Sequence, residues 1–552
     1  MPHSVAAGGS PAELDRLKTG PTGNMPRIVI DNREVDVPAG TTLLDAARRV
    51  GIDVPTLCWH EGFRPNTSCM VCVVKVGQRD GGPGRASGRL VPSCATLAED
   101  GMRVESETDE VRQVRRAMLE LLLSDHVGEC RAPCQHACPF DTDVPRMFEQ
   151  VAGGRLDEAI VTLRKAVPLP AVLGRVSREV CETACRRSAV DESASIGLLK
   201  RYVADKDLAS GDPYVPPCDP SSGKRVAVVG SGPAGLSAAY FLLQAGHTCA
   251  LFETRDKPGG TLCDLAEEQL PREVLAAEIA MIEHLGGRFE LSTTVGRQPA
   301  LTDLWRGFDA VLVAVGRLDA GRDEVLGLAI SEGCLRVDRT THETGEPGVF
   351  AAGDVVQPRG EAVRAAAAGK TAAVCIDQYL RDDPVVGRRK LVALRMGRPR
   401  PETFAIKAAR AGPTQRVIPS DGPGTGLTDS EARVEAQRCL RCDCRKLDKC
   451  RLQKFAEMYG ADGGRYRGQR REVEKPTGHP DVVYEPGKCI LCGLCIQVAE
   501  QAGEPLGLTY VGRGFDVYVG VPFDESLDQA LTIAARRCVE VCPTGALAWR
   551  LA

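Results

Sequence analysis

The stretch Lys224–Glu253, KRVAVVGSGPAGLSAAYFLLQAGHTCALFE, decides the fold of the central part of this chain. An apolar run enters Gly230-x-Gly232-x-x-Gly235, a helical pattern follows, and a second apolar run ends at Glu253. This order of strand, glycine turn, helix and strand predicts a Rossmann-like unit that binds a dinucleotide. The pyrophosphate is expected at the helix N-terminus and the ribose on the acidic side chain. A glycine-rich packing turn is the alternative.

Three later motifs indicate which dinucleotide this is. The tetrapeptide KPGG follows the acidic strand, FDAVLVAVG ends at Gly316, and GVFAAGDVV contains Gly353 and Asp354. The set resembles the FAD domain of disulfide-reductase-like flavoproteins, in which the matching aspartate binds the ribityl chain. The resemblance implies FAD contacts at Gly230, Gly232, Pro233, Ala234, Gly235, Glu253, Thr254, Gly259, Gly260, Gly316, Gly353 and Asp354.

Relatives with this fold insert a second Rossmann unit of about 100 residues, which binds NADPH, between the last two motifs. Here about forty positions separate Gly316 from Asp354, and no second GxGxxG occurs in the chain. We therefore expect no direct NAD(P)H site in this chain, and we expect the flavin to exchange electrons through neighbouring clusters.

The composition bounds the remaining possibilities. A chain of 552 residues with 43% hydrophobic residues predicts three or four domains, and a net charge of −4 without a basic face makes nucleic acid an unexpected partner. The chain has no run of eighteen apolar residues that would predict a membrane span, and its first two dozen residues lack the apolar h-region of a secretory signal. We therefore expect a cytoplasmic protein. In such a chain, 23 cysteines indicate metal sites rather than disulfides.

The expected fold is multidomain, α+β and α/β: a β-grasp ferredoxin head, a helical Fe–S domain, a Rossmann-like FAD domain and a ferredoxin-like Fe–S tail. In the head, RIVIDNREVDVPAG predicts a β-hairpin, and TTLLDAARRVGI predicts a helix capped by Thr41 or Thr42. The expected bounds are a disordered lead at 1–24, the head at 25–107, the helical [4Fe–4S] domain at 108–222, the FAD domain at 223–386, a linker or arm at 387–430, a Cys-rich cluster segment at 431–475 and the [4Fe–4S] tail at 476–552.

The first cysteine group has the spacing Cys58-x10-Cys69-x2-Cys72, with Cys94 downstream. Four thiolates on loops beside a small sheet suit an iron–sulfur cluster, whereas a structural zinc site, the alternative, usually uses two close pairs of ligands. The strings PTLCWH, SCMVCVVKV and LLLSDH resemble the N-terminal domain of the 75-kDa-type iron–sulfur subunit of NADH dehydrogenase. The resemblance implies one [2Fe–2S] cluster on these four cysteines.

The second group begins His126-x3-Cys130-x3-Cys134-x3-Cys138, and Cys181-x3-Cys185 follows later. CRAPCQHACP, PLPAVLGRV and CETAC resemble the helical cluster domain of the glutamate synthase small subunit, which dihydropyrimidine dehydrogenase shares. That family carries two [4Fe–4S] clusters in this domain. The resemblance implies a first cluster on His126, Cys130, Cys134 and Cys185, in which a neutral imidazole replaces a thiolate. An exposed helix-end histidine is the alternative.

The family's second cluster retains Cys138 and Cys181 as ligands, but this chain departs from the pattern at the other two positions. Ser177 stands where the family has a cysteine, and Lys200 stands where it has Gln or Glu. A serine oxygen is a poor substitute for a thiolate, and an ammonium repels a ferric centre. The alternative to a cluster is a pair of buried thiols.

Two more cysteine groups lie near the C-terminus. The first is Cys439-x2-Cys442-x-Cys444-x5-Cys450, for which we expect a [4Fe–4S] cluster, with zinc as the alternative. The second follows the bacterial ferredoxin layout and predicts a [4Fe–4S] cluster on Cys489, Cys492, Cys495 and Cys542. Ala499 replaces the cysteine of a second ferredoxin cluster, and Cys538 is interpreted as its remnant. The five separate cysteines are interpreted as buried hydrophobes: Cys218, Cys249, Cys263, Cys334 and Cys375.

The chain thus resembles a fusion of the NADH dehydrogenase head with a glutamate synthase small-subunit-like oxidoreductase that lacks its NADPH domain. The resemblance implies FAD, one [2Fe–2S] cluster and two to four [4Fe–4S] clusters, with no separate catalytic residue. The expected function is electron transfer within a hetero-oligomeric, NAD-linked complex. Electron bifurcation at the FAD is compatible with this expectation. The expected partners are NADH-oxidising flavoprotein or ferredoxin-like subunits and a hydrogenase or formate dehydrogenase module. The alternatives are a reductase feeding an amidotransferase, and a wiring scaffold with a non-redox FAD.

Overall fold

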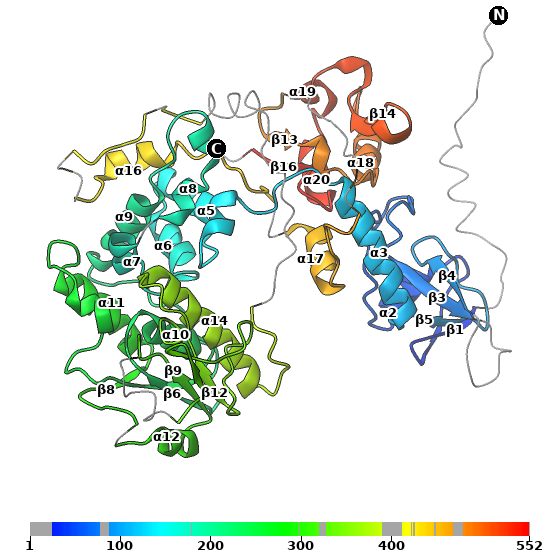
Figure 1. The fold of residues 1–552 in the computed structure, drawn as a ribbon. Coiled ribbons are helices and arrows are strands. Elements are labelled where there is room, and N and C mark those ends of the chain that lie inside the picture. Colours follow the sequence, from blue (N-terminus) through cyan, green and yellow to red (C-terminus); the bar gives the residue numbers. More distant parts are fainter. Residues whose placement is uncertain are drawn as a thin grey trace, which may run out of the picture. The chain divides into compact units, whose positions relative to one another are not determined.

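The computed structural model describes residues 25–77, 88–177, 179–296, 298–318, 327–388, 411–413, 415–420, 422, 425–446, 449–466, 468 and 478–550. They divide into two compact units (Figure 1): unit 1 holds described residues 25–130 and 443–550, and unit 2 holds 131–388 and 411–442. Unit 2 is therefore inserted into the sequence of unit 1. The expected lead at 1–24 lies outside the described residues, as does much of the expected linker.

The N-terminal part of unit 1 is a five-stranded sheet in the order β2-β1-β5-β3-β4. The expected hairpin is confirmed, because β1 and β2 pair antiparallel, and the expected helix α2 is capped by Thr42, which accepts from the Asp45 amide. The elements are β1 (Arg27–Ile30), β2 (Arg33–Asp36), α2 (Leu43–Arg49), β3 (Val73–Gly77), β4 (Arg89–Pro92), β5 (Arg103–Glu105) and α3 (Asp109–Asp125).

Helix α3 belongs to unit 1, although the bounds expected from the sequence grouped it with the helical domain. Arg115 on α3 is fully buried; its guanidinium donates to the Val73 carbonyl (2.9 Å) and to the Tyr459 hydroxyl (2.7 Å). These bonds fix α3 between the head sheet and the residue that ends α17 (Arg451–Met458). The expected Cys-rich segment at 431–475 is likewise divided, since unit 2 ends at Cys442 and unit 1 resumes at Asp443.

The C-terminal part of unit 1 has a small antiparallel pair, β13 with β16, against which helix α20 packs, while α18 packs on α20. Two short strands, β14 and β15, form a second pair. The elements are β13 (Val482–Tyr484), α18 (Leu494–Ala502), β14 (Thr509–Val511), β15 (Tyr518–Gly520), α19 (Leu527–Ala530), α20 (Ala535–Val541) and β16 (Leu547–Trp549).

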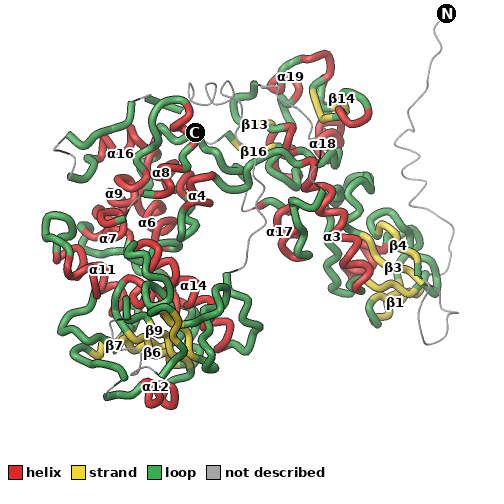
Figure 2. The backbone as a smooth tube through the Cα atoms, in the orientation of Figure 1, coloured by secondary structure: helices red, strands yellow, loops and turns green. Residues whose placement is uncertain are grey.

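Unit 2 begins with a helical layer, which Figure 2 shows as a group of short helices joined by loops. Its first-turn signals are clear in the sequence: Pro133 starts α4 and Pro170 starts α7, at positions where the missing N–H costs nothing. The helices are α4 (Pro133–Ala137), α5 (Val144–Ala152), α6 (Leu156–Arg164), α7 (Pro170–Val176), α8 (Val180–Thr183) and α9 (Ile196–Leu208).

The second part of unit 2 is a parallel sheet in the order β12-β9-β6-β7-β8, as the central motif predicts. Residues alternate between two apolar clusters: Val226 and Val228 face one side with α10 and α14, and Ala227 and Val229 face the other with α12 (Figure 1). The elements are β6 (Arg225–Val229), α10 (Pro233–Gln244), β7 (Thr248–Phe252), α11 (Arg272–His284), β8 (Arg288–Glu290), α12 (Leu301–Gly307), β9 (Ala310–Val313), β10 (Ile330–Ser331), β11 (Cys334–Leu335), β12 (Val349–Ala351) and α14 (Ala362–Leu380).

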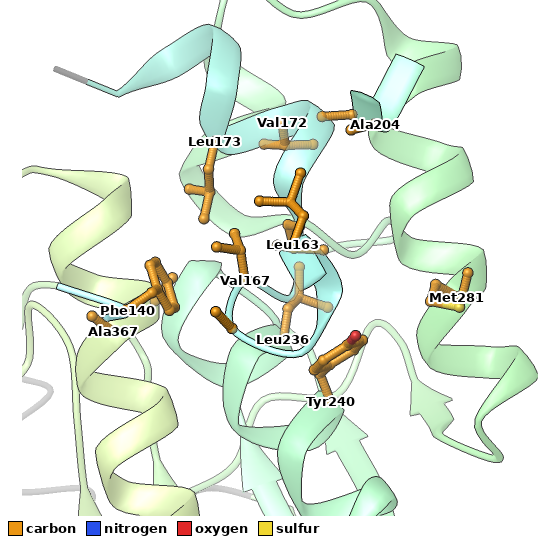
Figure 3. Packing of buried hydrophobic residues seen from close by; sticks show 14 of the residues in the cluster. Phe140, Leu163, Val167, Val172, Leu173, Ala204, Leu236, Tyr240, Met281 and Ala367 are labelled. Atoms are coloured by element: carbon orange, nitrogen blue, oxygen red, sulfur yellow. The ribbon is translucent and has the colours of Figure 1, made fainter. Parts of the chain in front are cut away.

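The helical layer and the sheet layer of unit 2 share one core, shown in Figure 3. Leu163 packs with Leu236 and Tyr240 of α10, and the Tyr240 hydroxyl donates to the Arg164 carbonyl (2.9 Å). A polar contact joins the same layers, because the partly buried Lys370 ammonium of α14 donates to the carbonyls of Phe140 and Ala166 (3.3 and 3.0 Å). The two layers are therefore one folding unit.

Unit 2 ends with an arm, residues 411–442, that contains α16 (Asp429–Ala436). Charged side chains hold the arm on the helical layer. The buried Arg187 donates to the carbonyls of Ala411 and Pro413 (3.1 and 2.7 Å), and the partly exposed Arg416 pairs with Glu182 (2.7 Å). No helix in the described part of the chain is long and apolar enough to span a membrane.

Candidate cofactor-binding sites

The glycine turn lies at the carboxyl end of β6, the edge at which open parallel sheets bind nucleotides. Gly230 has a φ of 104°, and a Cβ there would lie 2.4 Å from the Ala314 carbonyl oxygen. A Cβ on Gly235 would lie 1.9 Å from the Gly230 carbonyl oxygen, so the turn packs directly on the first turn of α10. Pro233 and Ala234, which open α10, are buried. The N-terminus of α10, which follows this turn directly, fits a pyrophosphate.

The loops after the neighbouring strands approach this turn. The Glu253 carboxylate follows β7, is buried, and accepts from the backbone amide and hydroxyl of Ser231 (2.9 and 2.6 Å). A Cβ on Gly260 would lie 2.7 Å from the Gly232 Cα, so the KPGG loop reaches the glycine turn. Thr254 is exposed. Sequence reasoning missed Ser231, whose role shows only in the hydrogen bonds of the folded turn.

The remaining expected flavin contacts follow β9 and β12. Gly316 has a φ of 78° with open space at its Cβ position. A Cβ on Gly353 would contact the Ala234 Cβ at 2.8 Å, which places the second flavin motif against the start of α10. The Asp354 carboxylate accepts from the Gly360 amide (3.2 Å). The carboxyl ends of β6, β7, β9 and β12 thus bring all three motifs to one edge.

The four cysteines of the head lie together and are buried. A hydrogen bond from Cys69 lowers the pKa of Cys58 to about 6, and one from Cys94 lowers the pKa of Cys72 to about 7. The charge of Cys58 also acts on Cys72 and Cys94, so the two pairs belong to one group. The same two hydrogen bonds raise the pKa of Cys69 and Cys94, so each pair shares one proton. Four buried sulfurs in two adjacent pairs fit the ligand set of a cluster.

The tail cysteines also lie together, around a small pocket lined by Cys489, Cys492, Cys495 and Cys542. Burial raises the pKa of Cys495 well above its ordinary value, and the charges of Cys492, Cys489 and Cys542 raise it further. The expected remnant Cys538 is fully buried, and its thiol donates to the Cys495 carbonyl (3.5 Å). The charge of Cys58 contributes to raising the pKa of Cys492, so the head cysteines lie close to the tail cysteines.

A third group in unit 1 consists of Cys130, Cys444 and Cys450. Burial raises the pKa of Cys450 to about 12, and the charges of Cys444 and Cys130 contribute to the rise. The Cys444 amide donates to the Cys130 carbonyl (3.2 Å), which joins the two chain segments. His126 is buried, and the Val127 amide beside it donates to the Gly487 carbonyl (2.6 Å).

Lys446 lies between the third group and the tail group. Its ammonium donates to the carbonyls of Val539 and Cys542, the latter at 2.6 Å. The charges of Cys542, Cys450 and Cys444 all act on it. Sequence reasoning missed this lysine, because a single basic residue in a polar stretch carries no signal of its own.

The fourth group lies in unit 2. Burial raises the pKa of Cys134 well above its ordinary value, and the charges of Cys439, Cys185 and Cys442 raise it further. The structure therefore groups these cysteines differently from the two sets expected from the sequence, the first cluster set of the helical domain and the Cys439–Cys450 set. Cys134 and Cys185 have Cys439 and Cys442 as neighbours in unit 2, whereas Cys130 has Cys444 and Cys450 in unit 1. The reason is that the chain passes between the units at 130–131 and at 442–443.

The described residues contain no three His, Cys, Asp or Glu side chains that converge on a single metal ion. In a [4Fe–4S] cluster each cysteine binds a different iron atom, and in a [2Fe–2S] cluster two cysteines bind each iron. The sulfurs of either site therefore surround a group of atoms instead of converging on one point. The donor chemistry of the four groups, which are sulfur-rich and enclosed, therefore fits clusters.

The five separate cysteines divide by burial. Cys249 and Cys375 are buried, as expected, and Cys263 and Cys334 are partly exposed. The expectation is wrong for Cys218, which is exposed, because the chain before β6 runs along the surface. None of the described cysteines forms a disulfide.

Three family models match the chain, in the order of its parts. Residues 24–109 match a 2Fe-2S iron–sulfur cluster binding domain, residues 109–212 match dihydropyrimidine dehydrogenase domain II with its 4Fe-4S cluster, and residues 228–277 match an NAD(P)-binding Rossmann-like domain. The expected fold class is thereby confirmed: a 2Fe–2S β domain, a helical Fe–S domain and a parallel-sheet Rossmann-like domain. The family model that matches residues 228–277 names NAD(P), so FAD as the bound dinucleotide stays a prediction.

Curated relatives match parts of the chain. The β subunit of NADP(+)-dependent formate dehydrogenase from Moorella thermoacetica is 37% identical over 36% of this chain and 31% of its own. PreT, a subunit of NAD-dependent dihydropyrimidine dehydrogenase from Escherichia coli K12, is 36% identical over 39% of this chain and 53% of its own. The glutamate synthase [NADPH] small chain of Bacillus subtilis is 34% identical over 32% and 36%. The chain thus spans about a third to a half of these relatives.

Proposed function

We propose that this chain is an electron-transfer subunit of a multi-subunit, NAD-linked oxidoreductase of the hydrogenase or formate dehydrogenase type. Iron–sulfur clusters supply one-electron steps, and a flavin connects one-electron with two-electron chemistry. The observation that carries the proposal is the succession of sulfur groups in unit 1. Cys58 of the head is the charge neighbour of Cys492, and Lys446 joins Cys542 of the tail to Cys444 and Cys450.

Protein groups between these sulfurs set their geometry. The Asn66 amide donates to the Cys492 carbonyl (3.0 Å), and the Arg451 guanidinium donates to the Thr56 hydroxyl (2.7 Å) while the charges of Cys69 and Cys492 act on it. We propose a [2Fe–2S] cluster on the head cysteines and [4Fe–4S] clusters on the tail group and on the third group. His126 is the proposed fourth ligand of the third group.

In unit 2 we propose one [4Fe–4S] cluster on Cys134, Cys185, Cys439 and Cys442, and FAD at the glycine turn. In the sequence, only Asp443 separates Cys442 from Cys444, so their Cα atoms lie within about 7 Å of each other by covalent geometry alone. We propose that electrons pass between the third group and the unit 2 cluster.

We propose that the dinucleotide is FAD and that the chain lacks its own NAD(P)H site. Between β9 and β12, the described residues form only the two-stranded sheet β10–β11 and connecting segments, whereas a nicotinamide domain needs a parallel sheet with its own glycine turn. Electrons would then reach the flavin from partner subunits through the clusters, in a cytoplasmic hetero-oligomer.

A second candidate function is a glutamate-synthase-type reductase that feeds an amidotransferase, and the match to the Bacillus subtilis small chain favours it. Anaerobic mixing separates the two. We expect the purified chain to hold FAD, to show no flavin reduction within seconds of adding NADH or NADPH, and to be reduced at once by reduced ferredoxin. A Cys492→Ser variant should slow the ferredoxin reaction more than tenfold. Rapid flavin reduction by NADPH alone would favour the second candidate, and a flavin that never changes redox state would favour a scaffold.

A further inference from the structure

A small cavity lies inside unit 2, between the helical layer and the first turn of α14. Its lining includes Cys138, Ser177, Cys181 and Lys200. These are the four positions that match the ligands of the family's second cluster in the helical domain. Phe140 and Val363 close its apolar side. The four groups expected from the sequence are therefore brought together, and their chemistry decides what the cavity holds.

The cavity's charged groups satisfy each other. Lys200 is buried, and its ammonium lies 3.0 Å from a carboxylate oxygen of Glu179 and 3.5 Å from the Cys181 sulfur. The Cys181 thiol donates to the same Glu179 oxygen (2.9 Å), and the Cys138 sulfur lies 3.3 Å from the Thr142 hydroxyl. A Cβ on Gly197 would lie 2.5 Å from the Glu179 Cγ, so the glutamate side chain is packed tightly in place.

This donor set does not fit a [4Fe–4S] cluster. Such a cluster takes four soft or anionic ligands, and the cavity offers two thiols. An ammonium has no lone pair with which to bind iron, and the Glu179 carboxylate already accepts from two donors. Ser177 has a buried hydroxyl that makes no hydrogen bond among the described residues, and a serine hydroxyl is a poor iron ligand.

We propose that this position is a closed cluster site: the Lys200–Glu179 ion pair occupies the place of the cluster, and Cys138 and Cys181 remain as thiols. Unit 2 then carries one cluster, on Cys134, Cys185, Cys439 and Cys442. The Cys181 thiol donates to Glu179 and the Cys138 sulfur contacts the Thr142 hydroxyl, in keeping with thiols that are not ligands. The ion pair is hard to displace, since removing one partner of a buried pair leaves the other charge unpaired.

Ser177 and Lys200 are the two departures that close the site, so reversing both should open it. In the anaerobically purified full chain, we expect Cys138→Ser and Cys181→Ser to leave iron and sulfide per chain unchanged. We expect the double variant Ser177→Cys/Lys200→Gln to gain about four irons per chain and a new EPR signal. The matched control is Cys134→Ser, which should lose about four irons.

Loss of about four irons from either Cys138→Ser or Cys181→Ser, with flavin content at the wild-type level, would overturn the proposal. A properly folded double variant without extra iron would show that the ion pair and the serine are not what exclude the cluster. The inference deepens the proposed function, but its readout is cofactor content, whereas the proposed function is tested by rates of flavin reduction. Either can therefore fail while the other stands.

Discussion

The Glu435→Gln substitution tests whether the arm at 411–442 supplies cluster ligands to unit 2. Glu435 is fully buried on α16, three residues before Arg438 and four before Cys439. Its carboxylate accepts from the Ser195 amide (2.7 Å), the Val417 amide (2.8 Å) and the Arg438 guanidinium (2.9 Å). One carboxylate thus holds the arm against the helical layer directly before the two arm cysteines.

The glutamine has the same shape but removes the charge and one of the two acceptor oxygens. Breaking a buried ion pair from one side costs about 3–5 kcal/mol. Here the lower limit applies, because Arg438 keeps Asp191 as a second partner at 3.3 Å. A cost of about 3 kcal/mol raises the population of the detached arm about 150-fold, since each 1.36 kcal/mol is a factor of ten.

The assay is the release of iron to a chelator from the anaerobic holoprotein. About four irons per chain should leave up to about 150-fold faster in the variant, and the remaining irons should leave at the wild-type rate. The control is Glu431→Gln on the same helix, an exposed capping carboxylate that accepts from the Thr428 and Ser420 amides (2.8 and 2.9 Å). Glutamine also serves at this position of a capping box, so a much smaller acceleration is expected. Wild-type iron release from a Glu435→Gln protein with a lowered unfolding temperature would refute the assignment of arm cysteines as ligands.

Three other perturbations probe separate parts of the molecule. Gly235→Val should abolish flavin binding in the purified chain, because even a Cβ would lie 1.9 Å from the Gly230 carbonyl oxygen. The control Gly307→Ala, whose Cβ would meet open space, should retain the flavin. Flavin absorbance per chain measures the flavin content of both variants. Burial raises the pKa of Glu278 to about 7 from 4.5, so the folded state binds the extra proton and stability falls as pH rises from about 4.5 to 7. Glu278→Gln should remove this fall of about 3 kcal/mol, and parallel plots of unfolding temperature against pH for the two proteins would contradict it. Lys446→Met should shift the EPR midpoint potentials of the clusters beside it to more negative values, since a nearby positive charge favours the reduced cluster; unchanged potentials would exclude this role.

Local patterns were enough to predict the parts of the fold that local interactions determine. The hairpin before Thr42, the helix that Thr42 caps and the parallel unit around Gly230 all follow from spacing, caps and turns. The division of the cysteines could not be read in the same way. Cys439, Cys442, Cys444 and Cys450 lie within twelve positions and read as one site. Spacing carries no information on where the chain leaves one folding unit and enters another.

Unit 2 is inserted into unit 1, and each of the two junctions between them has cysteines on both sides. At the first junction, Cys130 belongs to unit 1 and Cys134 to unit 2; at the second, Cys442 belongs to unit 2 and Cys444 to unit 1. The bond from the Cys444 amide to the Cys130 carbonyl holds the two unit 1 segments together where the chain leaves and returns. A cluster in each unit would then bind ligands from both the outgoing and the returning segment. Cross-links that close long loops stabilise most in principle. Loss of the third-group cluster should therefore loosen a loop of 314 positions, from Cys130 to Cys444, and loss of the unit 2 cluster should loosen one of 305 positions, from Cys134 to Cys439.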